Sequence, residues 1–85
     1  MSDIPRIDKI YPEYIPDGHW IDAGGWEVWA KGGGYHREDG PAVINPDGGI
    51  DWHLDGLWYS AFEDWLEANT YITDSQKVLL KLKYG

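Results

Sequence analysis

The sequence predicts an α+β fold, in which an antiparallel β-meander of hairpins is followed by a two-helix C-terminal unit. Three observations predict it: short strand-like runs between glycine-rich turns, a later change to helical spacing of apolar residues, and a length of 85 residues, which suits one domain. We therefore expect a single domain over residues 1–85. Its parts are a Pro-rich packing arm (1–16), β-hairpin repeats (17–59) and a helical hairpin (60–85).

The arm is interrupted by proline at Pro5, Pro12 and Pro16, which prevents a long helix because proline removes an amide donor and clashes with the preceding turn. Isoleucine recurs at every third position from Ile4 to Ile10. This spacing suits either a short helical turn or a polyproline-like strap. In either form we expect the arm to lie on the core, because large apolar groups are rarely left together in water.

The hairpin region alternates strand-like runs with turn signals. The runs are His19–Ile21, Trp26–Ala30, Pro41–Ile44, Ile50–Leu54 and Leu57–Tyr59. Asp55-Gly56 is a strong hairpin signal, because a type I′ turn needs positive φ at both central residues. Apolar and polar residues alternate in the run 50–54. Its three apolar residues should therefore share one face of a strand, with Asp51 and His53 on the other.

Two helices are predicted after residue 60. Ser60 and Glu63 have the spacing of a capping box, and so do Thr73 and Gln76. Apolar residues recur at helical spacing behind each box. Lysines gather towards the C-terminus, where they complement the helix dipole.

An internal repeat relates two of the hairpins. A shift of 23 residues aligns Trp29 with Trp52 and Gly33 with Gly56, and it also aligns Tyr35 with Trp58. Each repeat is then about one hairpin, and stacked hairpins would share one apolar face. The alternative is that short turn-rich strands match by chance.

The string His-Arg-Glu-Asp-Gly-Pro-Ala-Val runs from His36 to Val43, and it is followed by Asp47-Gly48 and by a second string from Trp52 to Gly56. This stretch resembles a repeat of small uncharacterised phage proteins, and it is distantly similar to MORN-type β-hairpin repeats. The resemblance covers about residues 26–68, which is half of the chain. It implies a meander of MORN-like hairpins and a phage origin, and it carries no known catalytic residues. Lys31–Gly34 departs from the pattern, which implies a looser first hairpin.

Composition narrows the classes of partner. The chain has 15 acidic and 7 basic residues, for a net charge of -8. This disfavours direct nucleic-acid binding and anionic membranes, and it favours a basic protein or one that normally binds nucleic acid. Solubility alone also explains such a charge. The chain has no cysteine, no long apolar run and no secretory signal at Met1–Pro5, so we expect it in the host cell cytoplasm.

Few side chains suggest catalysis. His19, His36 and His53 make up the inventory of a zinc site if hairpins bring them together. The segment His36–Asp39 offers a base, a cation and two carboxylates, but a structural turn explains it better. We expect no catalytic residues, no metal and no cofactor.

The candidate partner-binding residues are acidic and aromatic side chains of the hairpins and the first helix. They are Asp47, Asp51, Asp55, Trp58, Tyr59, Glu63, Asp64 and Glu67. If the carboxylates lie on one side, they can imitate backbone phosphates, although acidic faces are more often merely solvated. Trp58 and Tyr59, together with Trp20, are candidate interface anchors.

The sequence therefore predicts a non-enzymatic phage accessory protein. We expect it to bind and inhibit a host protein, such as a bacterial defence component in the manner of an anti-CRISPR, by steric occlusion through its sheet or acidic face. One alternative is a structural or assembly component that acts by self-association. The others are an acidic nucleic-acid mimic and a small hydrolase or metalloprotein that uses the histidines.

Overall fold

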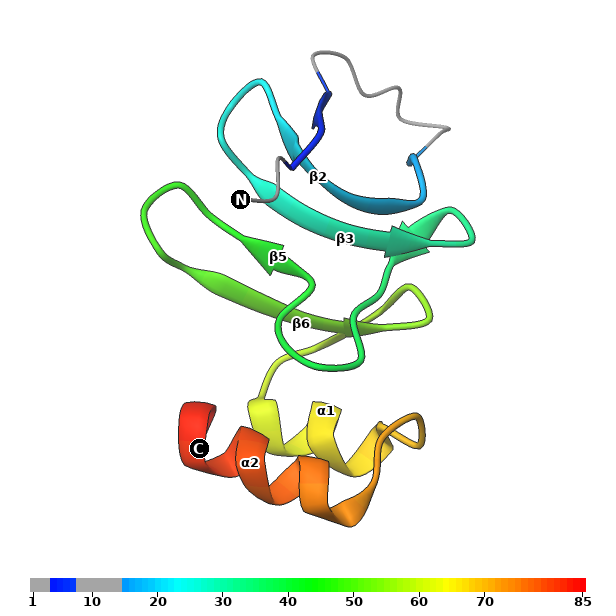
Figure 1. The fold of residues 1–85 in the computed structure, drawn as a ribbon, viewed down its shortest axis with the longest axis vertical. Helices are drawn as coiled ribbons and strands as arrows, with labels where there is room; N and C mark the ends of the chain where they lie inside the picture. Colours follow the sequence, from blue (N-terminus) through cyan, green and yellow to red (C-terminus); the bar gives the residue numbers. More distant parts are fainter. Residues whose placement is uncertain (1–3, 8–14) are drawn as a thin grey trace.

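The computed structural model describes residues 4–7 and 15–85 as a sheet with two helices at one end (Figure 1). The strands are β1 (Arg6–Ile7), β2 (Gly18–Asp22), β3 (Glu27–Lys31), β4 (Gly34–Tyr35), β5 (Val43–Ile44), β6 (Ile50–Leu54) and β7 (Leu57–Tyr59). The helices are α1 (Phe62–Ala68) and α2 (Asp74–Tyr84). This confirms the α+β class with C-terminal helices. None of the helices in the described part of the chain is long and apolar enough to cross a membrane.

The sheet is mixed rather than purely antiparallel. The strand order is β1-β2-β3-β5-β6-β7, with β4 paired to β3 beside this path. All pairs are antiparallel except β1, which lies parallel to β2. Within the predicted hairpin region, residues 17–59, every strand pair is antiparallel as expected. The parallel strand lies in the predicted arm, where the sequence suggested no strand and where the amide of Ile21 donates to the carbonyl oxygen of Pro5 at 2.8 Å.

The arm lies on the core where the structure describes it. Ile7 and Ile15 pack against the buried residues of β2 and β3, as expected of a packing arm. Arg6–Ile7 forms a short strand, however, and not the helical turn or strap that the sequence suggested. The rest of the predicted arm, residues 1–3 and 8–14, lies outside the described residues.

The register assigns side chains to two faces of the sheet. Val28 pairs with Val43 and Val43 pairs with Asp51, so these three side chains project from one face. Ile7 and Ile15 pack on this side, which we call the arm face. Trp29 and Trp52, each adjacent in sequence to one of these residues, project from the opposite side. We call it the helix face, because the helices pack against Trp52 there.

Two separate clusters form the core, one for each end of the sheet. The first joins the buried residues Trp20, Val28, Ala30, Ala42 and Val43. The second joins Trp52, Leu54, Trp65, Leu66 and Leu80. Within the second cluster the Trp52 ring centroid lies 4.6 Å from that of Trp65, 4.9 Å from that of Phe62 and 5.0 Å from that of Tyr84. A buried indole of this kind removes roughly 150–250 Å² from water, which stabilises the fold by about 4–6 kcal/mol.

The two hairpins of the repeat have equivalent pairing. Ala30 pairs with Tyr35 in the first hairpin, and the residues 23 positions later, His53 and Trp58, pair in the second. The equivalent residues Trp29 and Trp52 project from the same face, as the repeat predicts. The groups that pack on them differ: the helices bury Trp52, whereas Trp29 stacks on His19, with ring centroids 4.1 Å apart. The hairpins therefore share a face but not one continuous core.

The turns and helix ends show which of the local sequence signals predicted the observed structure. Asp55 and Gly56 have φ values of 53° and 81°, so the type I′ signal is confirmed. Thr73 and Gln76 form the predicted capping box at the start of α2. The box at Ser60 is wrong: α1 begins one residue later, after Ala61, and no side chain in the described part of the chain caps it.

Candidate functional site

A groove of about 580 Å³ lies on the arm face. The buried side chains of Val28 and Val43 form its floor. Asp22 and Trp26 come from the β2–β3 hairpin, and three further lining residues, Tyr35, His53 and Trp58, come from β4, β6 and β7. The groove therefore crosses the sheet, because β5 and β6 separate β3 from β7.

Two tryptophans at this groove expose their indoles. Trp58 is 63% exposed and Trp26 is 41% exposed. This is unexpected in a small domain, which depends on burying its large apolar side chains for stability. Exposed tryptophan next to a hollow is typical of binding surfaces, where large aromatic anchors carry much of the affinity. Trp26 was missed in the sequence, although its alternation with Val28 places it on the same face.

Only one of the three aromatic anchors suggested by the sequence is available. Trp20 is 2% exposed, and its indole donates to the carbonyl oxygen of Pro16 at 2.8 Å, so the prediction that it is an anchor is wrong. Tyr59 projects from the helix face and packs against the second cluster. Trp58 remains as an anchor, on the arm face, where it is the cross-strand neighbour of His53.

The groove is acidic. Asp22 and Asp51 line it, and no lysine or arginine among residues 4–7 and 15–85 does so. Burial lowers the pKa of His53 below its usual 6.5, and the nearby charge of Asp51 opposes this only in part. His53 is therefore neutral at pH 7, and its imidazole adds no positive charge to the groove.

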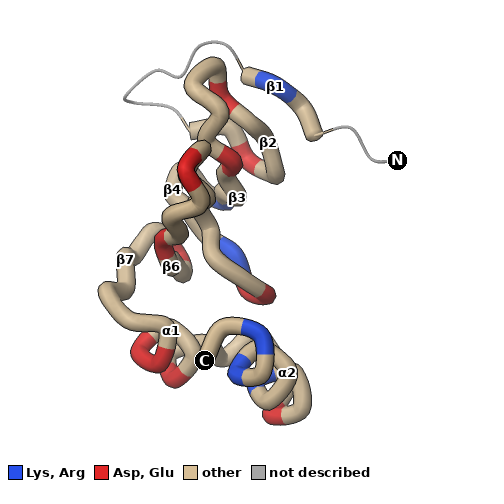
Figure 2. Tube along the Cα trace, turned by 90° about the vertical axis from the view of Figure 1, so that its left-hand side faces the viewer, with Lys and Arg blue, Asp and Glu red and all other residues tan. Residues whose placement is uncertain are grey.

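The structure does not bring the predicted acidic residues into one array. Asp47 and Asp55 lie in the turns at opposite ends of β6, while Asp51 lies on the arm face. Figure 2 shows acidic positions spread over the strands, the turns and α1. Glu63 and Glu67 of α1 line a hollow between the helices that two lysines of α2, Lys77 and Lys81, also line. Asp64 is exposed on α1. These lysines reduce the negative field of α1.

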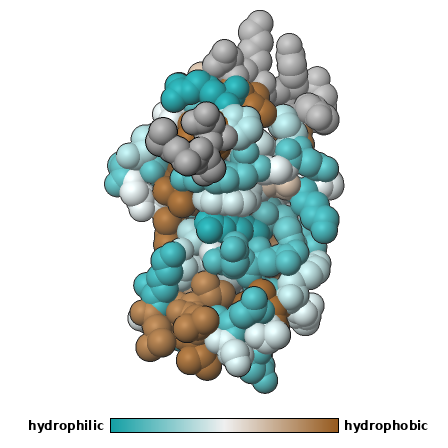
Figure 3. Space-filling view, in the orientation of Figure 1, coloured by the Kyte–Doolittle hydropathy of each residue, from teal (hydrophilic) through white to brown (hydrophobic). Residues whose placement is uncertain are grey.

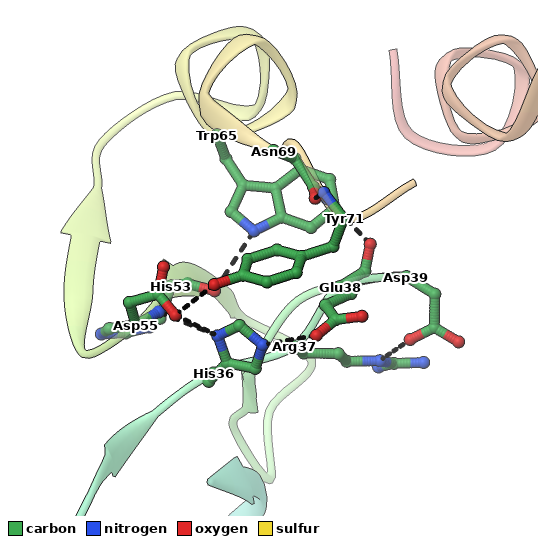
Figure 4. A network of polar contacts seen from close by, with 9 residues as sticks. All are labelled: His36, Arg37, Glu38, Asp39, His53, Asp55, Trp65, Asn69 and Tyr71. Carbon is green, nitrogen blue, oxygen red and sulfur yellow. Dashed lines mark hydrogen bonds and ion pairs between the residues drawn. The ribbon is translucent and has the colours of Figure 1, made fainter. Parts of the chain in front are cut away.

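The segment His36–Asp39 stabilises the fold (Figure 4). The buried ring of His36 has Nε2 2.9 Å from Glu38 Oε2, and its Nδ1 accepts from the amide of Asp55 at 2.8 Å. Nε2 must therefore carry the ring proton and donate it to Glu38. Tyr71 donates its hydroxyl to Asp55 Oδ1 at 2.6 Å. The predicted structural role of His36 is thus supported, and Asp55 is part of an internal network.

Two more contacts extend this network to the helices. Asn69, which is fully buried, donates from Nδ2 to the carbonyl oxygen of Glu38 at 2.8 Å and accepts from the amide of Tyr71 at 3.1 Å. The indole of Trp65 donates to the carbonyl oxygen of His53 at 3.2 Å. The sequence alone did not indicate this role of Asn69, because a contact across 31 residues leaves no local pattern.

The three histidines do not converge. His19 lies on the helix face with Nε2 2.6 Å from Glu27 Oε2, and His53 lies on the arm face. His36 lies in the network between the hairpins and the helices. Among residues 4–7 and 15–85 there is no group of three or more potential metal ligands. The geometry of the described residues gives the zinc alternative no support.

Comparison of the chain with models of protein families, with curated proteins and with solved structures finds no match. The function is therefore inferred from the geometry of the groove and its surroundings.

Proposed function

We propose that the chain is a non-enzymatic phage accessory protein that binds a host protein through the groove on its arm face and inhibits it by steric occlusion in the host cytoplasm. The observation that carries this proposal is the pairing of two exposed indoles, Trp26 and Trp58, with an acidic hollow of about 580 Å³. The phage origin rests on the resemblance of the string His36–Val43 to the phage repeat. A bacterial defence component is the class of target that we would test first.

The polar network supports a binding role over catalysis. The groups most suggestive of acid–base chemistry, His36, Glu38 and Asp55, are engaged with one another and with Tyr71. They hold the hairpins to the segment between the helices. A general base needs a nitrogen or oxygen that can reach substrate, and both ring nitrogens of His36 are already used.

The distribution of charge favours the sheet over the acidic face as the binding surface. The carboxylates of α1 share their hollow with lysines, and those of β6 are split between its two ends and one face. Nucleic-acid mimicry needs a regular array on one side. The mimic therefore remains a weaker alternative than occlusion through the sheet.

A pull-down with two matched variants tests the proposal. Tagged chain is incubated with nuclease-treated bacterial lysate, and bound proteins are identified by mass spectrometry. The test variant is Trp58→Ala, and its control is Leu57→Ala, a 62% exposed neighbour on the same strand that projects from the opposite face. We expect one dominant partner that Leu57→Ala retains and Trp58→Ala loses by about 30-fold in affinity, as for a hot-spot residue.

Circular dichroism of both variants confirms that they are folded. No dominant partner, or a partner that Trp58→Ala retains in full, would contradict the proposal.

A second candidate function, self-association in a structural role, is favoured by a different surface. Val78, Leu79 and Leu82 of α2 are 56%, 65% and 80% exposed. A hydrophobic patch is visible over α2 at the lower left of Figure 3. Contiguous exposed apolar surface of this kind often marks an interface. Light scattering at about 100 μM tests it: a strict monomer would contradict this role, and a dimer that Leu82→Glu dissociates would support it.

A further inference from the structure

We propose that the groove on the arm face holds a positively charged side chain, arginine or lysine, from an extended segment of the partner protein. This inference rests on the proposed function, since it takes the occupant to be a protein. It adds the chemistry by which the groove selects that protein.

The aromatic walls suit a cation. Trp26 and Trp58 expose ring surface at the groove, and tryptophan is the side chain whose face attracts a guanidinium or ammonium most strongly. The stem of arginine or lysine is apolar, so it can pack along the same rings while its head reaches a carboxylate.

The carboxylates supply the counter-charge. Asp22 is held in place, because its Oδ1 accepts from the amides of Gly24 at 2.8 Å and Trp26 at 3.0 Å. Asp51 lies on the same face, and its carboxylate makes no ion pair or hydrogen bond with side chains of residues 4–7 and 15–85. The neutral His53 beside it adds no positive charge that would repel an incoming cation. A cation in the groove would therefore give Asp51 the counter-charge that this part of the chain does not provide.

The helix face already shows how this chain holds a cation. The guanidinium carbon of Arg37 lies 3.8 Å from the ring centroid of Trp29. Its Nε donates to Asp39 at 2.9 Å and its Nη1 donates to the carbonyl oxygen of Pro41 at 3.1 Å. An indole and a carboxylate together thus secure a guanidinium on one side of the sheet. The groove presents the same two groups, an indole and a carboxylate, on the other side.

The position of Trp58 favours an extended occupant. β7 is the last strand in the sheet order, so it is an edge along which another strand can pair. Side chains of a paired strand alternate between the two faces. Every second side chain of such a segment would lie on the arm face, beside Trp58.

Short peptides test the inference directly. Three acetylated and amidated pentapeptides, Gly-Val-X-Val-Gly with X as arginine, lysine or citrulline, are titrated into the full chain by calorimetry at low salt. Citrulline keeps the shape of arginine without its charge. We expect the arginine and lysine peptides to bind at least about 10-fold more tightly than the citrulline peptide, with affinity falling as salt is added.

Matched variants place the binding in the groove. Asp51→Asn should weaken the arginine peptide by about 5- to 10-fold, whereas Asp74→Asn, which removes the same charge from an exposed position on α2, should change it by less than twofold. Trp58→Ala should reduce the preference for arginine over citrulline, because the indole is lost while the carboxylates remain, whereas Leu57→Ala should keep it. Equal binding of the arginine and citrulline peptides, or equal effects of the two Asp→Asn variants, would overturn the inference.

The two proposals can fail separately. A host partner that Trp58→Ala loses, together with peptides that bind without regard to charge, overturns the cation chemistry and leaves the binding role. Arginine-selective binding without any captured partner overturns the inhibitor role and leaves the chemistry of the groove.

Discussion

Replacement of Asn69 by alanine should weaken the link between the hairpins and the helices and destabilise the fold. Asn69 is fully buried at the end of α1. Its side chain donates to the carbonyl oxygen of Glu38 and accepts from the amide of Tyr71. Alanine removes both hydrogen bonds. The carbonyl oxygen of Glu38 then loses its side-chain donor at a position where the Asn69 side chain was shielded from water.

The expected loss follows from these two bonds. Each contributes about 1 kcal/mol net, and a buried polar group left without a partner costs roughly 1–3 kcal/mol. The Tyr71 amide lies in a half-exposed residue, so water partly replaces its bond, and the total is about 2–3 kcal/mol. At roughly 0.05–0.15 kcal/mol per residue, this is a large share of the stability of a domain of this size. The melting temperature should fall by about 10–20 °C.

Urea and thermal unfolding, followed by tryptophan fluorescence, measure this loss. The control is Thr70→Ala, an exposed neighbour, which should change stability by less than about 0.5 kcal/mol. If Asn69→Ala were as stable as Thr70→Ala, the network would not hold the helices to the sheet and the reasoning would be refuted.

Three further changes probe other parts of the fold. The hydrogen bond from Tyr71 to its carboxylate partner raises the pKa of Tyr71 above its usual 10.0, so the unfolded chain loses this proton at a lower pH than the folded chain. The free energy of unfolding should therefore fall above about pH 10, and Tyr71→Phe should flatten that part of a urea-unfolding pH profile. A profile that Tyr71→Phe leaves unchanged would count against the bond. Thr73→Ala should cost about 1 kcal/mol in the same assay, whereas Ser60→Ala should cost almost nothing, and equal losses would mean that the observed caps are wrong. Gly34→Ala should lower the melting temperature by several degrees, because its Cβ would lie 2.9 Å from the Cα of Gly56; an unchanged melting temperature would show that the two turns do not meet this closely.

Local patterns predicted the elements whose geometry is decided within a few residues. The alternation in Ile50–Leu54 and the positive φ of Asp55-Gly56 depend on neighbours only, and both appear in the structure. Thr73 caps α2 for the same reason. The Ser60 box failed although its spacing was correct, since α1 begins after Ala61 and that residue, not Ser60, occupies the N-cap position.

Features that depend on distant partners could not be predicted. Trp20 and Trp58 both lie in strand-like runs, yet Trp20 is buried in a core cluster against which the arm packs, and Trp58 lies at the open edge of the sheet. The parallel pairing of Arg6–Ile7 with β2 has no signature in so short a run. The groove itself exists because β4, β6 and β7 bring Tyr35, His53 and Trp58 to one side, which is a property of the register and not of any single strand.

Trp29 and Trp52 are shielded by different groups, and this difference makes α1 and α2 the terminal element of the sheet. Trp29 is covered by single side chains of its own hairpin region, and such cover can recur in every unit of a stacked series. Trp52, in the last unit, has no next hairpin to lie against, and the helices take that place. Solenoid proteins need a terminal unit that closes such a series. The helices α1 and α2 therefore close the Trp52 end of the sheet, in the place that a further hairpin would take in a stacked series.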